Sequence, residues 1–208
     1  MKVLVTRPKH DMANHYLYFW TGKVLDWAKN KTIEVIDLKQ EKSNKKNVCG
    51  YLKRDRADTA LLNGHGDEQA IFGHGNEELF SVKDDLSFLK GKTIFMRACR
   101  AGKILGAQAV KSGAKAVIGY DEDFQFWHLQ DYLHKPLDDP FARPYMEASN
   151  QVSISLLKGH TASTAQKNSM KRYKKEIVKM LNSDSNSSLL PSLLHNMMHQ
   201  VCIENNGR

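Results

Sequence analysis

Short apolar runs alternate with segments long enough to form a helix, and this alternation constrains the fold of the chain most strongly. The apolar runs lie at residues 2–6, 32–38, 59–63, 93–98 and 115–120. Helical spacing or helix-forming composition marks the segments between them, at 12–29, 44–56, 84–89 and 102–111. Strands joined by crossover helices pair in parallel, so the sequence predicts an α/β fold with a mostly parallel central sheet flanked by helices.

The pattern changes in the second half of the chain. Residues 121–143 are polar and aromatic, and this segment is too long for a simple turn. We therefore expect a loop that takes part in function there. Helices are predicted at 145–159 and 161–181, before a polar linker and an apolar tail that ends near residue 204. We expect the tail to be a docked helix, although a detachable partner-binding helix would have the same composition. The predicted division is a domain at 1–182 and a linker with a helical tail at 183–208.

Composition narrows the class of protein. The 208 residues suffice for one domain with its own core, and the net charge of +8 suits either a polyanionic partner or a solvated basic surface. Direct nucleic-acid binding is therefore not predicted. No apolar run approaches the roughly 18 residues of a membrane helix, and the first residues lack a signal-peptide core, so we expect no membrane contact and a cytoplasmic location. The three cysteines have no CxxC spacing, which favours neither a disulfide framework nor a zinc ribbon.

Two of the predicted strands end close to a reactive side chain. The strand at 59–63 leads to His65, and the strand at 93–98 leads to Cys99. Catalytic groups in parallel sheets gather at the carboxyl ends of strands. We call the edge of the sheet formed by these strand ends the rim, and we expect both side chains to lie on it. An imidazole there can take the proton of the thiol, and the N–H groups of Gly66 and Cys99 can bind an oxyanion. The alternative is that Cys99 is a small core residue at the end of a buried strand.

The sequence around these residues resembles that of the caspase-like cysteine peptidases. NGHGDEQAIFGHG is similar to their histidine loop, and LKGKTIFMRACRAG is similar to their cysteine strand, which ends in Ala-Cys-Arg-Gly in caspases and in Ala-Cys-x-x-Gly variants in bacterial CHAT relatives. The resemblance covers about residues 59–127 and implies a three-layer caspase-like fold with His65 as base and Cys99 as nucleophile. It also implies an endopeptidase that acts on a protein substrate. We expect neither a cofactor nor a metal site. Bacterial members often act in antiviral defence or programmed death, frequently after activation by a partner protein.

Arg97 departs from the pattern of some relatives. The residue two before the cysteine lies on the same strand face and helps to build the pocket for the substrate side chain. Metacaspases and clostripain-like enzymes carry Asp there and cut after Arg or Lys, so Arg97 favours an acidic or neutral substrate side chain. We take Arg97, Asp67 and Asp123 as candidate substrate-binding residues. The alternative is that Arg97 pairs with one of these two acids and only shapes the loop.

Two other functions remain open. One is a catalytically inactive caspase-like module whose basic segment at 161–181 contacts nucleic acid or an acidic partner. The other is a glutamine-amidotransferase-like hydrolase, in which the histidine follows Cys99 in the chain and the His-Gly motif has no role. The candidates for that histidine are His128, His134 and His160.

Several other side chains are predicted to have a structural role or to be exposed to solvent. His74 is predicted to be a surface histidine in a turn. Acidic residues after the strand at 115–120 are expected to be solvated, although they could line the cleft or bind a divalent ion. Aromatic packing is favoured over a substrate groove for Phe124, Phe126 and Trp127. No zinc site is predicted for the tail group His195, His199 and Cys202.

Overall fold

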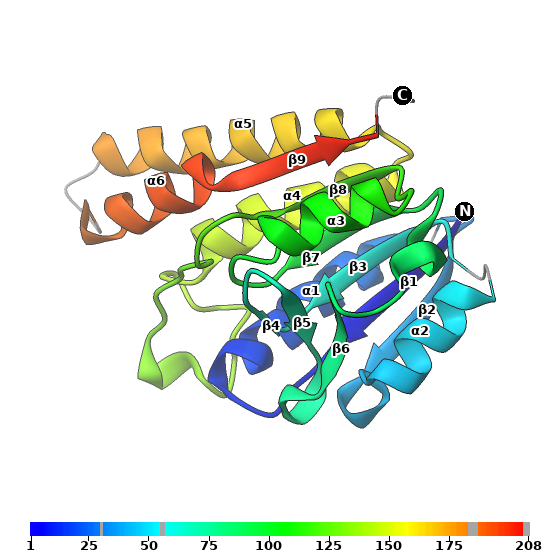
Figure 1. Ribbon diagram of the computed structural model, residues 1–208. Helices are drawn as coiled ribbons and strands as arrows, with labels where there is room; N and C mark the ends of the chain where they lie inside the picture. The colour runs from blue at the N-terminus through cyan, green and yellow to red at the C-terminus, as the bar shows by residue number, and fades with distance from the viewer. Residues whose placement is uncertain (30, 55–56, 183–186, 206–208) are drawn as a thin grey trace.

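A computed structural model describes residues 1–29, 31–54, 57–182 and 187–205. Its centre is a six-stranded sheet with the order β2-β1-β3-β7-β8-β9 (Figure 1). The strands are β1 (Lys2–Arg7), β2 (Glu34–Lys39), β3 (Thr59–Asn63), β7 (Thr93–Arg97), β8 (Ala116–Tyr120) and β9 (Gln200–Glu204). All neighbouring strands pair in parallel except β9, which is antiparallel to β8.

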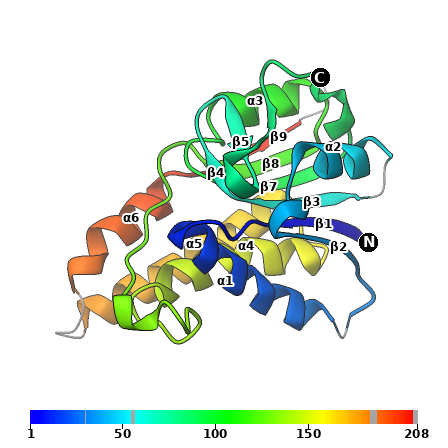
Figure 2. The ribbon, with the colours of Figure 1, turned by 90° about the horizontal axis from the view of Figure 1, so that it is seen from below.

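Helices cover both faces of this sheet (Figure 2). One face carries α1 (Met12–Ala28), α4 (Arg143–Leu157) and α5 (Ala162–Leu181), and the other carries α2 (Lys45–Lys53) and α3 (Ile104–Lys111). Short 3₁₀ turns are η1 (Gln40–Lys42), η2 (His74–Asn76), η3 (Leu86–Leu89), η4 (Gln130–Tyr132) and η5 (Ser187–Leu189). The predicted α/β fold, a mostly parallel sheet flanked by helices in three layers, is confirmed. None of the described helices combines the length and apolar content that a bilayer crossing requires.

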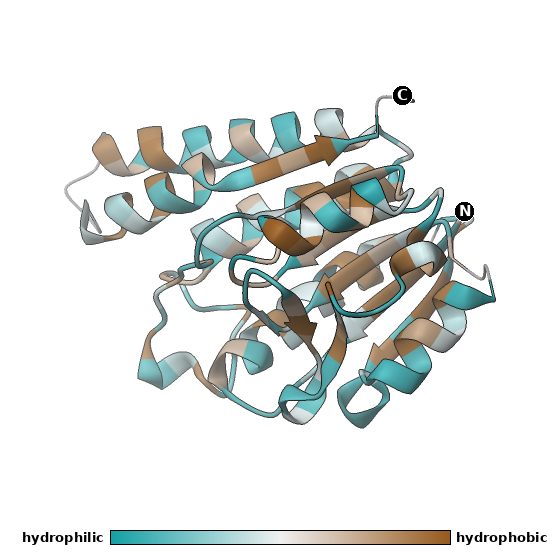
Figure 3. Cartoon of the chain, in the orientation of Figure 1, coloured by the Kyte–Doolittle hydropathy of each residue, from teal (hydrophilic) through white to brown (hydrophobic). Residues whose placement is uncertain are grey.

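The central strands are buried on both faces, as their continuous apolar runs predicted. Leu61 and Phe95 face the core under α1, α4 and α5, whereas Leu62 and Met96 face the core under α2 and α3. The same strands are coloured mainly as hydrophobic in Figure 3. Successive residues of these strands therefore point into different layers.

A small antiparallel sheet follows β3 directly and contains β4 (His65–Gly66), β5 (Ala70–Phe72) and β6 (Glu78–Ser81). Gly64 makes the sharp connection, because a Cβ there would lie 1.9 Å from the carbonyl oxygen of Phe72. The sequence analysis predicted a turn around His74, and the structure places that turn between β5 and β6.

The tail differs from the prediction. Its helix, α6 (Leu190–Met198), packs against α5, but the chain then becomes β9 rather than continuing as helix. Cys202 pairs with Ile118 and Gln200 with Tyr120, so β9 covers the open edge of β8. An unpaired edge next to a buried strand favours such pairing over a further helical turn. Residues 183–186 of the predicted linker lie outside the described residues, and the division at 182 stays a prediction. The segment predicted as a helix at 84–89 contains only the short η3 turn.

Candidate active site

Asp11 and His65 meet where β1 and β3 end. Asp11 is the N-cap of α1, and its Oδ1 accepts a hydrogen bond from the backbone N–H of Asn14 at 2.8 Å. Its Oδ2 lies 2.7 Å from Nε2 of His65. Since Nε2 is engaged in this way, Nδ1 is the ring nitrogen left for proton transfer. The His65 side chain is 41% exposed, so a substrate can reach it.

The carboxylate of Asp11 is held in its ionised form. Burial opposes ionisation, but hydrogen bonds from Asn14 and His65 outweigh this effect and lower the pKa of Asp11. An ionised carboxylate at Nε2 favours the tautomer that carries its proton there and stabilises the imidazolium. The sequence analysis did not identify Asp11. The signal was present, because Asp11 follows a strand toward the same rim and Asp is a favoured N-cap residue.

Cys99 lies on a turn just beyond β7. Arg100 has a φ of 53°, in the left-handed region, and its N–H donates to the carbonyl of Glu122 at 3.1 Å. Burial raises the pKa of the Cys99 thiol, the N–H of Phe124 acts in the opposite sense, and the nearby carboxylate of Asp123 raises the pKa further. The thiol is half-buried, and its surroundings favour the protonated form.

The histidine loop and the cysteine turn are in direct contact. A Cβ at Gly66 would lie 2.7 Å from the carbonyl oxygen of Cys99, so only glycine fits between them. The loop is also tied to the start of α3, since Leu105 N–H donates to the Glu68 carbonyl at 2.8 Å. Lys103 Nζ lies 2.8 Å from Glu68 Oε1. The strand-end residues selected from the sequence thus belong to neighbouring segments of one rim.

The N–H of Gly66 lies outside the hydrogen-bond ladder of the small sheet. Asp67 N–H donates to the Ala70 carbonyl at 3.0 Å, and His65 is paired with Phe72. Hydrogen-bonded pairs alternate along antiparallel strands, so Gly66 is at a position that points its N–H away from β5. That N–H is available to an oxygen atom on the rim.

Arg97 is buried below the rim and only 1% exposed. Its Nε donates to Asn63 at 2.9 Å, Nη1 to Asn150 at 2.7 Å, and Nη2 to Thr21 at 2.5 Å. Burial lowers the pKa of Arg97 to about 10. A substrate carboxylate could not reach this guanidinium without displacing its partners from β3, α1 and α4.

The acids expected to pair with Arg97 have other partners. Asp67 Oδ1 accepts hydrogen bonds from the N–H groups of Gln69 and Ala70, at 2.7 and 2.8 Å. Asp123 Oδ1 lies 2.9 Å from Nε of Arg100. The alternative in which Arg97 pairs with one of these acids was therefore wrong. Its side chain points into the helical layer below the sheet, whereas both acids belong to loops above the strand ends.

Two cavities flank Met12 on the rim. One, of about 590 Å³, borders Cys99 through Phe124 and is lined mainly by that residue, Phe126, Trp127 and Met12. The other, of about 480 Å³, is lined by Asp11 and its neighbours before and in α1, and by Leu133 and His134. Phe124 and Phe126 also pack into the core as predicted, but Trp127 is 58% exposed.

The remaining histidines are engaged elsewhere. His74 lies in η2, in the predicted turn, with its ring 5.1 Å from that of His10. In the tail, Nδ1 of His199 lies 2.9 Å from Asp121 Oδ1. His160 precedes α5, whose first turn bonds to Glu204 at the amino end of β8, so His160 lies at the end of the sheet opposite to Cys99.

No protein-family model matches the chain, and no curated protein does. Solved structures match over 98% of it. A complex of the pro- and mature domains of RgpB from Porphyromonas gingivalis aligns with a TM-score of 0.59 at 14% identity, over 47% of that chain. A secreted C11 cysteine protease from Bacteroides thetaiotaomicron, in complex with an irreversible peptide inhibitor, aligns with a TM-score of 0.54 at 11% identity, over 66% of that chain.

The chain therefore spans about half to two thirds of the length of these two structures. Both matched proteins are caspase-like cysteine peptidases. The fold of this chain is that of the caspase-like cysteine peptidases, with a mostly parallel sheet between helical layers.

Proposed function

We propose that the chain is a cysteine endopeptidase with Cys99 as nucleophile and His65 as general base. The observation that supports it most is the rim itself. A histidine oriented by an ionised carboxylate and a cysteine follow neighbouring strands, and Gly66 packs on the cysteine backbone. These are the groups that acyl transfer needs: a nucleophile, a base, a residue that orients the base, and an N–H donor.

The proposed reaction begins when Nδ1 of His65 accepts the proton of the Cys99 thiol. The sulfur forms a bond to the peptide carbonyl carbon, and the N–H groups of Gly66 and Cys99 donate to the oxyanion. His65 then gives its proton to the leaving amine as the C–N bond breaks. Water, deprotonated by His65, attacks the acyl-enzyme and releases the acid and the thiol. Each oxyanion donor contributes about 2.7–4 kcal/mol to lowering the barrier in such sites.

The proposed enzyme rests in a form of low reactivity. The thiol of Cys99 has a raised pKa and lies beside Asp123, which favours the protonated form. We propose that a protein partner, or the substrate itself, displaces the loop that carries Asp123 and so releases the thiol. This role for a partner agrees with the family resemblance in the sequence.

The proposed substrate is a protein segment with a neutral side chain at the cleavage site. Arg97 is enclosed by three hydrogen-bonding partners, so it offers no exposed charge for an acidic side chain. The cavity beside Cys99 is lined by aromatic residues and Met12 instead. Asp67 and Asp123 remain candidates for contacts with the substrate backbone at the edge of the rim.

The cellular setting is also a proposal. The Ala-Cys-x-x-Gly pattern supports a place near the bacterial CHAT branch, and with it a cytoplasmic role in antiviral defence or programmed death. Neither direct nucleic-acid binding nor membrane contact is part of this proposal.

Labelling with a peptide acyloxymethyl ketone, located by peptide mass spectrometry, tests the dyad. We expect modification at Cys99 to be at least about tenfold faster than at Cys49 and Cys202, because His65 is the proposed base for Cys99. His65→Ala should abolish the difference, whereas His134→Ala, a change at another exposed rim histidine, should not. Equal, slow labelling of all three thiols would contradict the proposal and favour the inactive binding module.

A further inference from the structure

Three side chains that can ligate a metal converge on the rim. His10, Asp11 and His65 each offer one ligand atom, and these atoms all lie within 4.8 Å of one another. We call these residues the rim triad. Among the residues that the structure describes, this is the one place where three His, Cys, Asp or Glu side chains meet in this way.

The two imidazoles face a single oxygen atom. Asp11 Oδ2 lies 2.7 Å from Nε2 of His65 and 3.1 Å from Nε2 of His10. In a tetrahedral zinc site, with bonds of about 2.0–2.2 Å, ligand atoms lie about 3.3 Å apart. The His10 contact is already close to this separation, and the His65 contact reaches it with a shift of about 0.6 Å. Solvent can supply the remaining ligand, since the His65 side chain is 41% exposed.

The triad is already held in place. Asp11 is fixed as the N-cap of α1, where its Oδ1 accepts a hydrogen bond from the N–H of Asn14. The side chain of His10 is only 16% exposed and packs edge-on against the ring of His74. A site whose ligands are oriented before binding loses less conformational entropy when the ion arrives.

We propose that the rim triad binds Zn²⁺ or a similar divalent transition-metal ion and that the bound ion switches the enzyme off. Two imidazoles and one carboxylate favour borderline metals such as Zn²⁺, Co²⁺ and Ni²⁺ over Mg²⁺ and Ca²⁺, which prefer oxygen ligands. The metal-binding part of this inference stands on the triad alone, and the inhibition rests on the proposed function.

Inhibition follows from the ring chemistry of His65. An ion bound at Nε2 takes the place of the proton there, so the remaining ring proton of the neutral imidazole moves to Nδ1. Nδ1 is the nitrogen that must accept the thiol proton of Cys99, and a protonated Nδ1 cannot do so. The ion also occupies the carboxylate of Asp11 that would stabilise the imidazolium. Removal of the ion restores the original tautomer, so the block is reversible.

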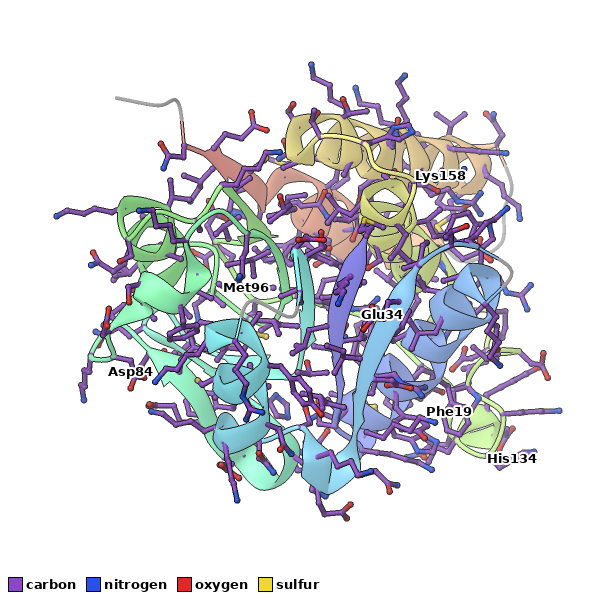
Figure 4. The ribbon with its side chains drawn as sticks, turned by 90° about the vertical axis from the view of Figure 1, so that its right-hand side faces the viewer. Phe19, Glu34, Asp84, Met96, His134 and Lys158 are labelled. Atoms are coloured by element: carbon purple, nitrogen blue, oxygen red, sulfur yellow. The ribbon has the colours of Figure 1, made fainter. Side chains whose placement is uncertain are left out.

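Calorimetric titration with ZnCl₂ tests the binding. The experiment uses the full chain carrying Cys99→Ala, so that neither catalysis nor the rim thiolate contributes. We expect binding at micromolar Zn²⁺, and His10→Gln in this background should weaken it at least about tenfold. His134→Gln is the matched control, because His134 lines the cavity next to the triad but lies outside it, at the edge of the molecule in Figure 4. Equal zinc affinity in the parent and His10→Gln proteins, or no binding in either, would overturn the site.

Probe labelling of the wild-type chain tests the inhibition separately. Zn²⁺ should slow modification of Cys99, a chelator should restore it, and MgCl₂ should have no effect. Each protein is compared with its own labelling rate without metal, and His10→Gln should lose most of the slowing that Zn²⁺ causes in the wild type. If Zn²⁺ binds but the labelling rate of Cys99 does not change, the proposed inhibition is wrong while the metal site is retained. If no form labels at Cys99, the proposed function fails, while the calorimetry still decides the metal site.

Discussion

Asp11 caps α1 with one carboxylate oxygen and contacts His65 with the other. A single substitution can distinguish these two roles. Asn is as good an N-cap as Asp, so Asp11→Asn should keep α1 capped while removing the charge beside His65. We expect Asp11→Asn to slow probe labelling of Cys99 by about tenfold or more, with the free energy of unfolding changed by less than about 0.5 kcal/mol. Asp11→Ala should lose about 1 kcal/mol in addition. Labelling kinetics and urea unfolding measure the two effects.

The pH dependence gives an independent check on the same residue. The pKa of Asp11 is lowered in the folded chain, so its ionisation stabilises the fold above its unfolded value, near pH 4, and this contribution is lost as the pH falls through the folded value. Asp11→Asn should therefore lose less stability than the wild type on acidification. Wild-type labelling rates in Asp11→Asn would show that the carboxylate does not position His65.

Asp123 should restrain the nucleophile. Its carboxylate raises the pKa of Cys99 and also holds Arg100, whose charge acts in the opposite sense. Asp123→Asn should therefore increase the thiolate fraction at neutral pH and speed iodoacetamide labelling of Cys99 by about three- to tenfold. Asp121→Asn is the control, because Asp121 bonds to His199 instead. A slower rate in Asp123→Asn would mean that the acid supports the thiolate.

At the scale of elements, the contact between β4 and the cysteine turn determines the geometry of the site. A Cβ at Gly66 would meet the Cys99 carbonyl at 2.7 Å and Ala98 Cβ at 2.9 Å, and neither atom belongs to a flexible side chain. We expect Gly66→Ala to cost about 1–3 kcal/mol of stability and to reduce Cys99 labelling strongly. Thermal unfolding and labelling on the same samples test this.

Gly50→Ala is a matched control for the added methyl group. Gly50 lies inside α2, where a Cβ would meet only the tip of Arg54 at 3.4 Å. Alanine is the better helix former by about 0.8–1 kcal/mol, so this variant should be more stable with unchanged labelling. An equal loss in both variants would mean that Gly66 has no special role.

Elements with a clear period were predictable from the sequence. The five parallel strands, α1, α4 and α5 follow from apolar spacing, and the rim argument selected His65 and Cys99 before their environment was known. Asp11 could not be selected in the same way, because a strand-end motif marks the nucleophile and the base but not the residue that orients the base. The strand β9 was missed because a short apolar segment after a helix shows no period of its own, and its pairing with β8 is a long-range contact.

Across the whole molecule, Arg97 shows what periodicity leaves open. The alternation of side chains along β7 identifies the face of the sheet on which Arg97 lies. It carries no information about which elements cover that face. Asn63 from β3, Thr21 from α1 and Asn150 from α4 converge on the guanidinium. Only the packing of three distant segments determines that Arg97 is a buried anchor below the rim. A pocket side chain at the same strand position would require these helices to stand further apart.

The tail should support both the sheet and the site. β9 covers the open edge of β8, and Gln200 donates to Tyr120 OH at 3.0 Å. Val201 packs on the turn that follows Cys99, since a Cβ at Gly102 would lie 2.7 Å from its Cγ2. We expect truncation after His199 to lower the free energy of unfolding by about 3 kcal/mol or more and to slow Cys99 labelling.

A point variant in the same tail controls for unspecific effects of changing it. Met198 is 72% exposed at the end of α6, so Met198→Ala should change the free energy of unfolding by less than about 0.5 kcal/mol. Urea unfolding of both forms, followed by probe labelling in native buffer, gives the two quantities. A truncated chain as stable and as reactive as the full chain would mean that β9 pairs without supporting the core. If the truncated chain keeps its stability but Cys99 is no longer labelled, the loss of β9 acts through the turn that follows Cys99, on which Val201 packs.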